Sequence, residues 1–201
     1  MGILRRSSRP ALPAAVADAL DLRRGERVIA WGTGPVVSAA GVGGRAYVVA
    51  TDRDSRALTC ARANLKQLGL AGSVKVVEAD LYPPGRASLV VCNPPWLPAR
   101  ANSPLDHAIY DPDSAMLKGF LAGLAGHLEP GGEGWLVLSD LAEHLGLRSR
   151  EALLAAIAAA GLKVVARHDT KPTHPRAVDD SDPLHAARAA EITSLWRLAA
   201  A

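Results

Sequence analysis

The segment Asn93-Pro94-Pro95-Trp96 holds the residue types that most directly suggest chemistry. A planar amino or amide nitrogen becomes nucleophilic when acceptors hold its N–H groups in a way that favours pyramidal geometry. The side-chain oxygen of Asn93 and the carbonyl of Pro94 could supply those two acceptors. Fixed proline φ angles keep the acceptors rigid, and Trp96 could stack on the planar group. The segment therefore predicts a reaction at such a nitrogen, with its rate gained mainly from the orientation of the reacting groups.

The same segment also permits a structural interpretation, in which Asn93 caps a turn and Trp96 fills the core. However, the segment follows the apolar run Ser88–Cys92, which is expected to be a buried strand. The carboxyl end of a strand is where open α/β sheets bind ligands. This position favours the functional interpretation.

Three further features point to a nucleotide-like cofactor. Gly32-Thr33-Gly34 follows the first expected strand, and glycines let the backbone approach a ligand and turn into a helix. Asp52 ends the second strand about 20 residues later, where a carboxylate could accept both ribose hydroxyls or cap the next helix. Asp80 follows the third strand and could accept from an adenine amino group, or could be an ordinary turn residue.

Short apolar runs alternate with helix-period segments along the chain. Seven runs are expected to be strands: Arg27–Trp31, Ala46–Thr51, Val74–Val77, Ser88–Cys92, Gly134–Leu138, Leu162–Arg167 and Glu191–Leu198. This alternation predicts an α/β fold with a doubly wound, mostly parallel sheet that carries helices on both faces.

The intervening helices carry recognisable start and stop signals. They are expected over Leu12–Leu20, from Pro35, between the cap Asp54 and Gly69, from Leu117 to the Gly131-Gly132 turn, and over Glu151–Ala160. No helix is evident between the last two strands. The long irregular stretches Leu97–Pro112 and Thr170–Ala189 suggest that one of them closes the site.

Composition favours one domain in a reducing compartment. The 201 residues are 49% hydrophobic, yet no run approaches the roughly 20 apolar residues that span a bilayer. We expect a basic, partly helical extension over residues 1–26 and a catalytic domain over residues 27–201. Cys60 and Cys92 lack ligand spacing, which predicts neither a disulfide framework nor a zinc site and fits the cytoplasm. The net charge of +3 is too slight to indicate a nucleic-acid binder by itself.

From about Arg27 to Leu198, the chain resembles the Rossmann-like methyltransferases that carry an Asn/Asp-Pro-Pro-aromatic motif. It is similar in particular to small domains related to release-factor glutamine methyltransferases. The resemblance implies a seven-stranded sheet whose last strand is antiparallel, and S-adenosyl-L-methionine as the cofactor. It also implies that the methyl acceptor is a nucleobase amino group in RNA or DNA, or a protein glutamine, with no membrane and no metal involved.

The resemblance also assigns roles to residues. Gly32 and Gly34 match the methionine-binding loop, Asp52 the ribose-binding acid, Asp80 the adenine-contacting acid, and Asn93, Pro94, Pro95 and Trp96 the catalytic segment. Thr33 and Asn93 are expected to contact the cofactor as well.

The chain departs from the family pattern in three places. Ala30 stands where the family usually has an acid that contacts the methionine amino group, Val36 replaces a third glycine, and Ser88 replaces an aspartate. Glu26 or another carboxylate could substitute for the missing acid. Ala30 and Val36 support an alternative, a degenerate methyltransferase fold that binds RNA or a protein without catalysis. A nicotinamide oxidoreductase is disfavoured, since the third glycine of G-x-G-x-x-G is missing and no Tyr-x-x-x-Lys follows.

Two other clusters have rival interpretations. Asp140, Glu143 and His144 could be metal ligands on one helix face, but a capping box formed by Asp140 and Glu143 is favoured. The loop residues Asp106, His107, Tyr110 and Asp111 could recognise a substrate or remove a proton, or could simply be solvated.

Overall fold

The structure is a computed structural model that describes residues 47–98, 110–171 and 184–201, and the backbone of residues 27–31. The glycine loop, the predicted helices Leu12–Leu20 and from Pro35, and the residues Val36, Asp106 and His107 lie outside the described residues. The boundary predicted between residues 26 and 27 therefore stays a prediction.

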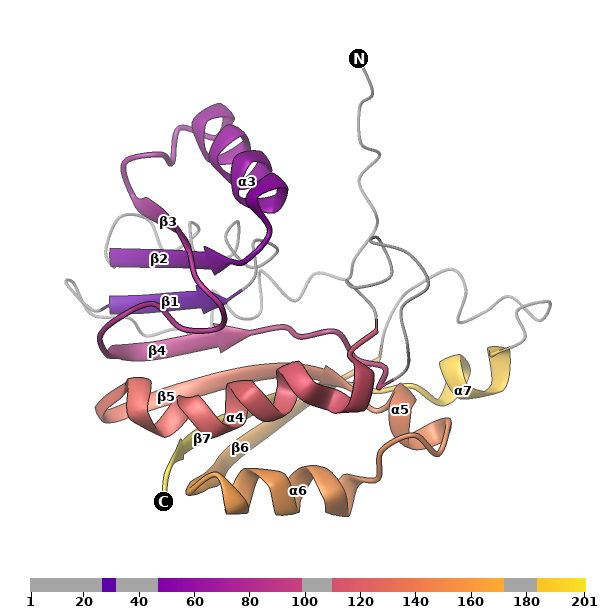
Figure 1. The fold of residues 1–201 in the computed structure, drawn as a ribbon. Helices are drawn as coiled ribbons and strands as arrows, with labels where there is room; N and C mark the ends of the chain where they lie inside the picture. The colour runs from indigo at the N-terminus through magenta and orange to yellow at the C-terminus, as the bar shows by residue number, and fades with distance from the viewer. Residues whose placement is uncertain (1–26, 32–46, 99–109, 172–183) are drawn as a thin grey trace.

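The described strands form one seven-stranded sheet in the order β3-β2-β1-β4-β5-β7-β6 (Figure 1). They are β1 (Arg27–Trp31), β2 (Tyr47–Asp52), β3 (Val74–Glu78), β4 (Ala87–Cys92), β5 (Leu128–Ser139), β6 (Leu162–Thr170) and β7 (Thr193–Ala200). Strands β1 to β5 pair in parallel, whereas β7 runs antiparallel to both β5 and β6. The predicted mostly parallel sheet is confirmed.

Helices cover both faces of the sheet. The described helices are α3 (Ser55–Gln67), the 3-10 turn η2 (Pro112–Ser114), α4 (Ala115–His127), α5 (Leu141–His144), α6 (Arg150–Ala159) and α7 (His185–Ala190). Alternate residues of β5 point to opposite faces. Leu136 packs in the core cluster that contains α4 and α6, whereas Val137 packs in the cluster that contains Leu65 of α3. Helix α3 therefore lies on the opposite face from α4 and α6.

The larger core lies between α4 and the centre of the sheet. Phe120, Leu121 and Leu124 are fully buried there. A Cβ at Gly134 of β5 would lie 2.3 Å from Cδ2 of Leu124, so this glycine is what allows the helix to approach the strand so closely.

Helix α3 begins and ends as its sequence predicts. The side chain of Asp54 accepts a hydrogen bond from the backbone N–H of Arg56 at 2.8 Å, which is the expected N-cap. Gly69 follows the helix with φ +70°, a conformation that favours glycine. These two signals were sufficient to predict the ends of α3, because both act within one turn of the helix.

Two expectations about the helices are wrong. Helix α4 ends at His127 rather than at the Gly131-Gly132 turn, because Leu128 is already extended and pairs with Ala87 of β4. The short helix α7 also stands between β6 and β7, where no helix was expected. Six residues are too few to display a helical period. Among the described helices, none is both long and apolar enough to cross a membrane.

Candidate functional site

The polar residues singled out by sequence lie at one edge of the sheet. Strands β2, β3, β4 and β5 are parallel, so their carboxyl ends share that edge, and the antiparallel β7 begins there (Figure 1). Asp52 is the last residue of β2, Asp80 lies two residues beyond β3, and Asn93 immediately follows β4. The topology thus brings the three expected site residues to the same edge.

Asp52 is half-buried, and its Oδ1 accepts a hydrogen bond from the backbone N–H of Asp54 at 3.0 Å. The cap of helix α3 is Asp54 rather than Asp52, so the capping alternative for Asp52 is wrong. A carboxylate offers about four acceptor sites, and the one bond that the described residues make to Asp52 leaves capacity for two further hydroxyl donors. Asp52 therefore fits the recognition of a ribose.

Asp80 has an exposed side chain in a turn whose neighbours are anchored. The backbone N–H of Tyr82 donates to the carbonyl of Asp80 at 3.0 Å, and Leu81 has φ +69°. The Tyr82 hydroxyl donates to the carbonyl of Phe120, and its ring stacks on His127 with centroids 4.2 Å apart. Burial raises the pKa of Tyr82 far above its ordinary value, so the hydroxyl stays protonated. These anchors hold Asp80 at the edge while its carboxylate remains accessible.

The segment after β4 is partly buried and internally hydrogen-bonded. Pro94 and Pro95 are buried, whereas Asn93 and Trp96 are half-buried. The indole Nε1–H of Trp96 donates to Oδ1 of Asn93 at 2.9 Å. Trp96 also packs against both core clusters, as its structural interpretation expected. The preceding Cys92 is fully buried, and this burial raises the pKa of its thiol.

Asp111 has a structural role that neither sequence interpretation anticipated. It is only 5% exposed, and its carboxylate accepts hydrogen bonds from the backbone N–H groups of Met116 and Leu117 at 2.9 and 3.0 Å. Its own N–H donates to the carbonyl of Leu97 at 2.7 Å. Asp111 therefore links the Asn93–Trp96 segment to the start of α4, and it is a buried, hydrogen-bonded residue rather than a solvated loop residue.

Tyr110 is half-buried and packs against the small cluster of Leu97, Leu141 and Ala142. This cluster attaches helix α5 to the chain just beyond Trp96. Of the four loop residues singled out by sequence, Tyr110 and Asp111 thus contact the chain just beyond Trp96 and fix its position.

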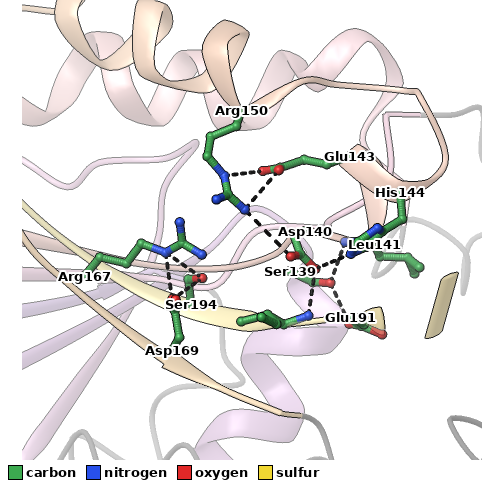
Figure 2. Close-up of polar contacts among 11 residues, drawn as sticks. Ser139, Asp140, Leu141, Glu143, His144, Arg150, Arg167, Asp169, Glu191 and Ser194 are labelled. Carbon is green, nitrogen blue, oxygen red and sulfur yellow. Dashed lines mark hydrogen bonds and ion pairs between the residues drawn. The ribbon is translucent and has the colours of Figure 1, made fainter. Parts of the chain in front are cut away.

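Asp140 follows β5 and belongs to a polar network rather than a capping box (Figure 2). Its side chain makes no cap hydrogen bond to α5, and Oδ1 instead accepts from the backbone N–H of Ile192 at 2.7 Å. Arg150 Nη2 lies 3.8 Å from Asp140 Oδ2 and 3.1 Å from Glu143 Oε2. His144 Nε2 lies 3.4 Å from Asp140 Oδ1. The predicted capping box is wrong, because the Asp140 side chain accepts from Ile192, the residue just before β7, and not from an N–H of α5.

Ser139 and Glu191 continue this network (Figure 2). The Ser139 hydroxyl donates to Oε1 of Glu191 and accepts from the backbone N–H of Leu141 at 3.0 Å. Both side chains are buried. Sequence reasoning missed them because they are 52 positions apart and carry no local signal. Over the described residues, no cluster of three or more His, Cys, Asp or Glu side chains could hold a metal ion.

Solved structures place this architecture among the Rossmann-like methyltransferases. A SAM-dependent methyltransferase from Thiobacillus denitrificans, in complex with S-adenosyl-L-homocysteine, aligns over 100% of both chains with a TM-score of 0.61 and 17% identity. TrmN from Thermus thermophilus aligns over 98% of this chain and 51% of its own, with a TM-score of 0.64 and 22% identity. The predicted Rossmann-like methyltransferase fold is confirmed.

The chain belongs to the methyltransferase small domain family, whose sequence profile matches residues 14–157. Among curated proteins, it is 34% identical over 166 residues to the release factor glutamine methyltransferase of Deinococcus radiodurans. It is 36% identical over 101 residues to that of Moorella thermoacetica. These alignments cover 74% and 44% of this chain, but only 56% and 36% of the relatives. The family resemblance predicted from sequence is confirmed.

Proposed function

We propose that this protein is an S-adenosyl-L-methionine-dependent methyltransferase that acts on a planar amide or amino nitrogen. A protein glutamine is the leading acceptor, and a nucleobase in RNA or DNA is the other. The observation that carries the proposal is the half-buried, oriented amide of Asn93 at the sheet edge that also holds Asp52 and Asp80. The names of the curated relatives support glutamine as the acceptor.

Asp52 and Asp80 would hold the adenosine part of the cofactor through the ribose hydroxyls and the adenine amino group. Gly32, Thr33 and Gly34 would surround the methionine part, and Asn93 would adjoin it. The fit rests on Asp52, whose carboxylate retains acceptor capacity, and on Asp80, whose side chain is exposed. When bound, the cofactor supplies a methyl group on a positively charged sulfur.

The acceptor nitrogen would be held by Asn93 Oδ1 and by the Pro94 carbonyl, with the Trp96 ring beside it. Buried Pro94 and Pro95 keep this stretch of backbone rigid. Two acceptors fix both N–H groups and direct the nitrogen lone pair along the transfer line, so that orientation supplies much of the rate. No covalent enzyme intermediate is required.

The proposal includes a cytoplasmic location. Both cysteines, exposed Cys60 and buried Cys92, are free thiols, which fits a reducing compartment. The alternative function is a degenerate module that binds RNA or protein without catalysis. Ala30 favours this alternative, because the family's usual acid is missing from that position of β1.

The first test is calorimetric titration of the full chain with S-adenosyl-L-methionine, S-adenosyl-L-homocysteine and NAD. We expect binding of the first two and none of NAD. Transfer of radiolabelled methyl to a purified bacterial release factor and to total RNA then identifies the acceptor class. Failure to bind either adenosyl compound would overturn the proposal and favour the degenerate module.

A further inference from the structure

We infer that Trp96 is a positioning residue, whose indole N–H sets the orientation of the Asn93 amide so that its oxygen faces the methyl acceptor. This inference rests on the proposed function and assigns a role to one bond within the site. The role differs from stacking, because it depends on the edge of the indole ring rather than on its face.

The contact itself determines which end of the Asn93 amide lies where. The indole Nε1–H can only donate, so the atom 2.9 Å away must be an acceptor, which is Oδ1 of Asn93. Rotation of the amide by half a turn would bring its NH2 group against the indole N–H. Two donors would then face each other, which disfavours the rotated state.

The donor is held in place by the core. Trp96 is half-buried and packs against the core clusters on both faces of the sheet. The next residue, Leu97, is buried and accepts a hydrogen bond from the N–H of Asp111 at 2.7 Å. The position of the indole is therefore determined by packing on both sides of the sheet. The hydrogen bond from the indole N–H in turn fixes the position of the Asn93 oxygen.

The orientation has a direct chemical consequence. A carbonyl oxygen has two lone pairs, so Oδ1 can accept from Trp96 and still accept one N–H from the substrate. Without the indole donor, the terminal torsion of asparagine is broad and has roughly two-fold symmetry. The amide would then spend part of its time with NH2 toward the acceptor nitrogen, where it cannot hold an N–H group.

The test compares Trp96→Phe with Trp96→Leu in the methyl-transfer assay, with the acceptor that the wild type labels. Phenylalanine keeps an aromatic ring but removes the N–H, whereas leucine removes both. We expect Trp96→Phe to lower kcat by about tenfold, with the acceptor KM and the affinity for S-adenosyl-L-homocysteine within about twofold of wild type. A stacking role alone predicts an active Trp96→Phe enzyme and an impaired Trp96→Leu enzyme.

Trp135→Phe is the matched control. The indole of Trp135 donates to Oε2 of Glu133 at 2.8 Å, and the residue is only 4% exposed. This variant also loses one partly buried indole hydrogen bond, but one made to Glu133 within β5 rather than to the Asn93 amide. We expect its kcat to stay at the wild-type value even if its melting temperature falls.

A second readout follows the bond without catalysis. The indole N–H of Trp96, one of four in the chain, should exchange slowly in a nitrogen–proton correlation spectrum. Asn93→Ala should accelerate that exchange and leave the Trp135 signal unchanged. Wild-type kcat in Trp96→Phe, or unaltered exchange in Asn93→Ala, would overturn the inference. A wild-type protein that binds the cofactor but methylates nothing would overturn the proposed function instead.

Discussion

The carboxyl ends of β2 and β3 differ from those of β4 and β5 in how their polar side chains are satisfied. Among the described residues, half-buried Asp52 bonds only to a backbone N–H two residues away, and Asp80 is exposed. By contrast, Asp140 is buried and bonds to the N–H of Ile192, 52 positions away. Buried Asp111 likewise bonds to the start of α4.

The difference follows from the cost of burying a charge. A buried carboxylate must be fully hydrogen-bonded or paired, so it has little capacity left for a ligand. A carboxylate that serves a ligand must stay partly open until the ligand arrives. We therefore interpret the β2–β3 edge as a ligand-binding surface and the β4–β5 edge as a rigid frame around Asn93 and Trp96.

The largest effect should come from Asn93→Ala, which removes the acceptor at the centre of the frame. We expect turnover to fall by about 10²–10³-fold, the range found when one preorganised hydrogen-bonding group is deleted from an active site. The affinity for S-adenosyl-L-homocysteine should stay nearly unchanged. Radiolabel transfer and calorimetry measure the two quantities, and preserved turnover would remove Asn93 from the mechanism.

Asp140→Ala tests whether the β4–β5 edge is a frame. It deletes the partner of the Ile192 N–H and one partner of Arg150, so we expect the free energy of unfolding to fall by about 3 kcal/mol. Glu143→Ala is the matched control, since Glu143 pairs with the same Arg150 at a more exposed position. It should cost about 0.5 kcal/mol in the same urea titration. Equal losses would contradict the distinction between the two carboxylates.

In contrast to Asp140→Ala, Asp52→Ala should weaken cofactor binding and leave stability nearly unchanged. We expect the dissociation constant for S-adenosyl-L-homocysteine to rise by about 10–100-fold, because a charged acceptor for the ribose is lost. The urea midpoint should barely move, since Asp52 makes only a local bond in the described structure. A large loss of stability with unaltered affinity would mean that the β2–β3 edge, like the β4–β5 edge, serves stability rather than ligand binding.

The smallest effect concerns Glu133, which lies earlier in β5. The two hydrogen bonds from Arg197, at 2.7 and 2.6 Å, hold the pKa of Glu133 below its ordinary value of 4.5, and burial partly opposes them. Because the folded-state pKa is depressed, the contribution to stability is present above pH 4.5. It is lost as the pH falls through the folded-state pKa.

Glu133→Gln should therefore flatten the pH dependence of unfolding below pH 4.5, with little change in cofactor affinity. Arg197→Met should flatten it in the same way, since it removes the other half of the pair. Urea titrations at pH 7 and in acid provide the measurement. An unaltered acid limb in both variants would show that the pair does not couple to folding.

Local patterns in the sequence were sufficient for much of the fold. The apolar runs predicted the positions of the strands, and Asp54 and Gly69 predicted the ends of α3. Each signal acts within a few residues, through helix capping or through the alternation of side chains in a strand. The same reasoning placed Asp52, Asp80 and Asn93 at strand ends, where the parallel topology gathers them. Their roles in binding and catalysis stay predictions.

The sequence by itself thus determined the fold class, the family and the edge of the sheet where the candidate residues meet. Only the tertiary structure decided that α4 stops at His127, since the pairing of Leu128 with Ala87 outweighs the helical pattern. It also decided that Asp111 and Asp140 accept hydrogen bonds from distant parts of the chain and that the Trp96 indole donates to Asn93. The physical reason is the same for each. A buried polar group or a strand takes its partner from wherever the fold brings one, and such partners leave no trace in the neighbouring sequence.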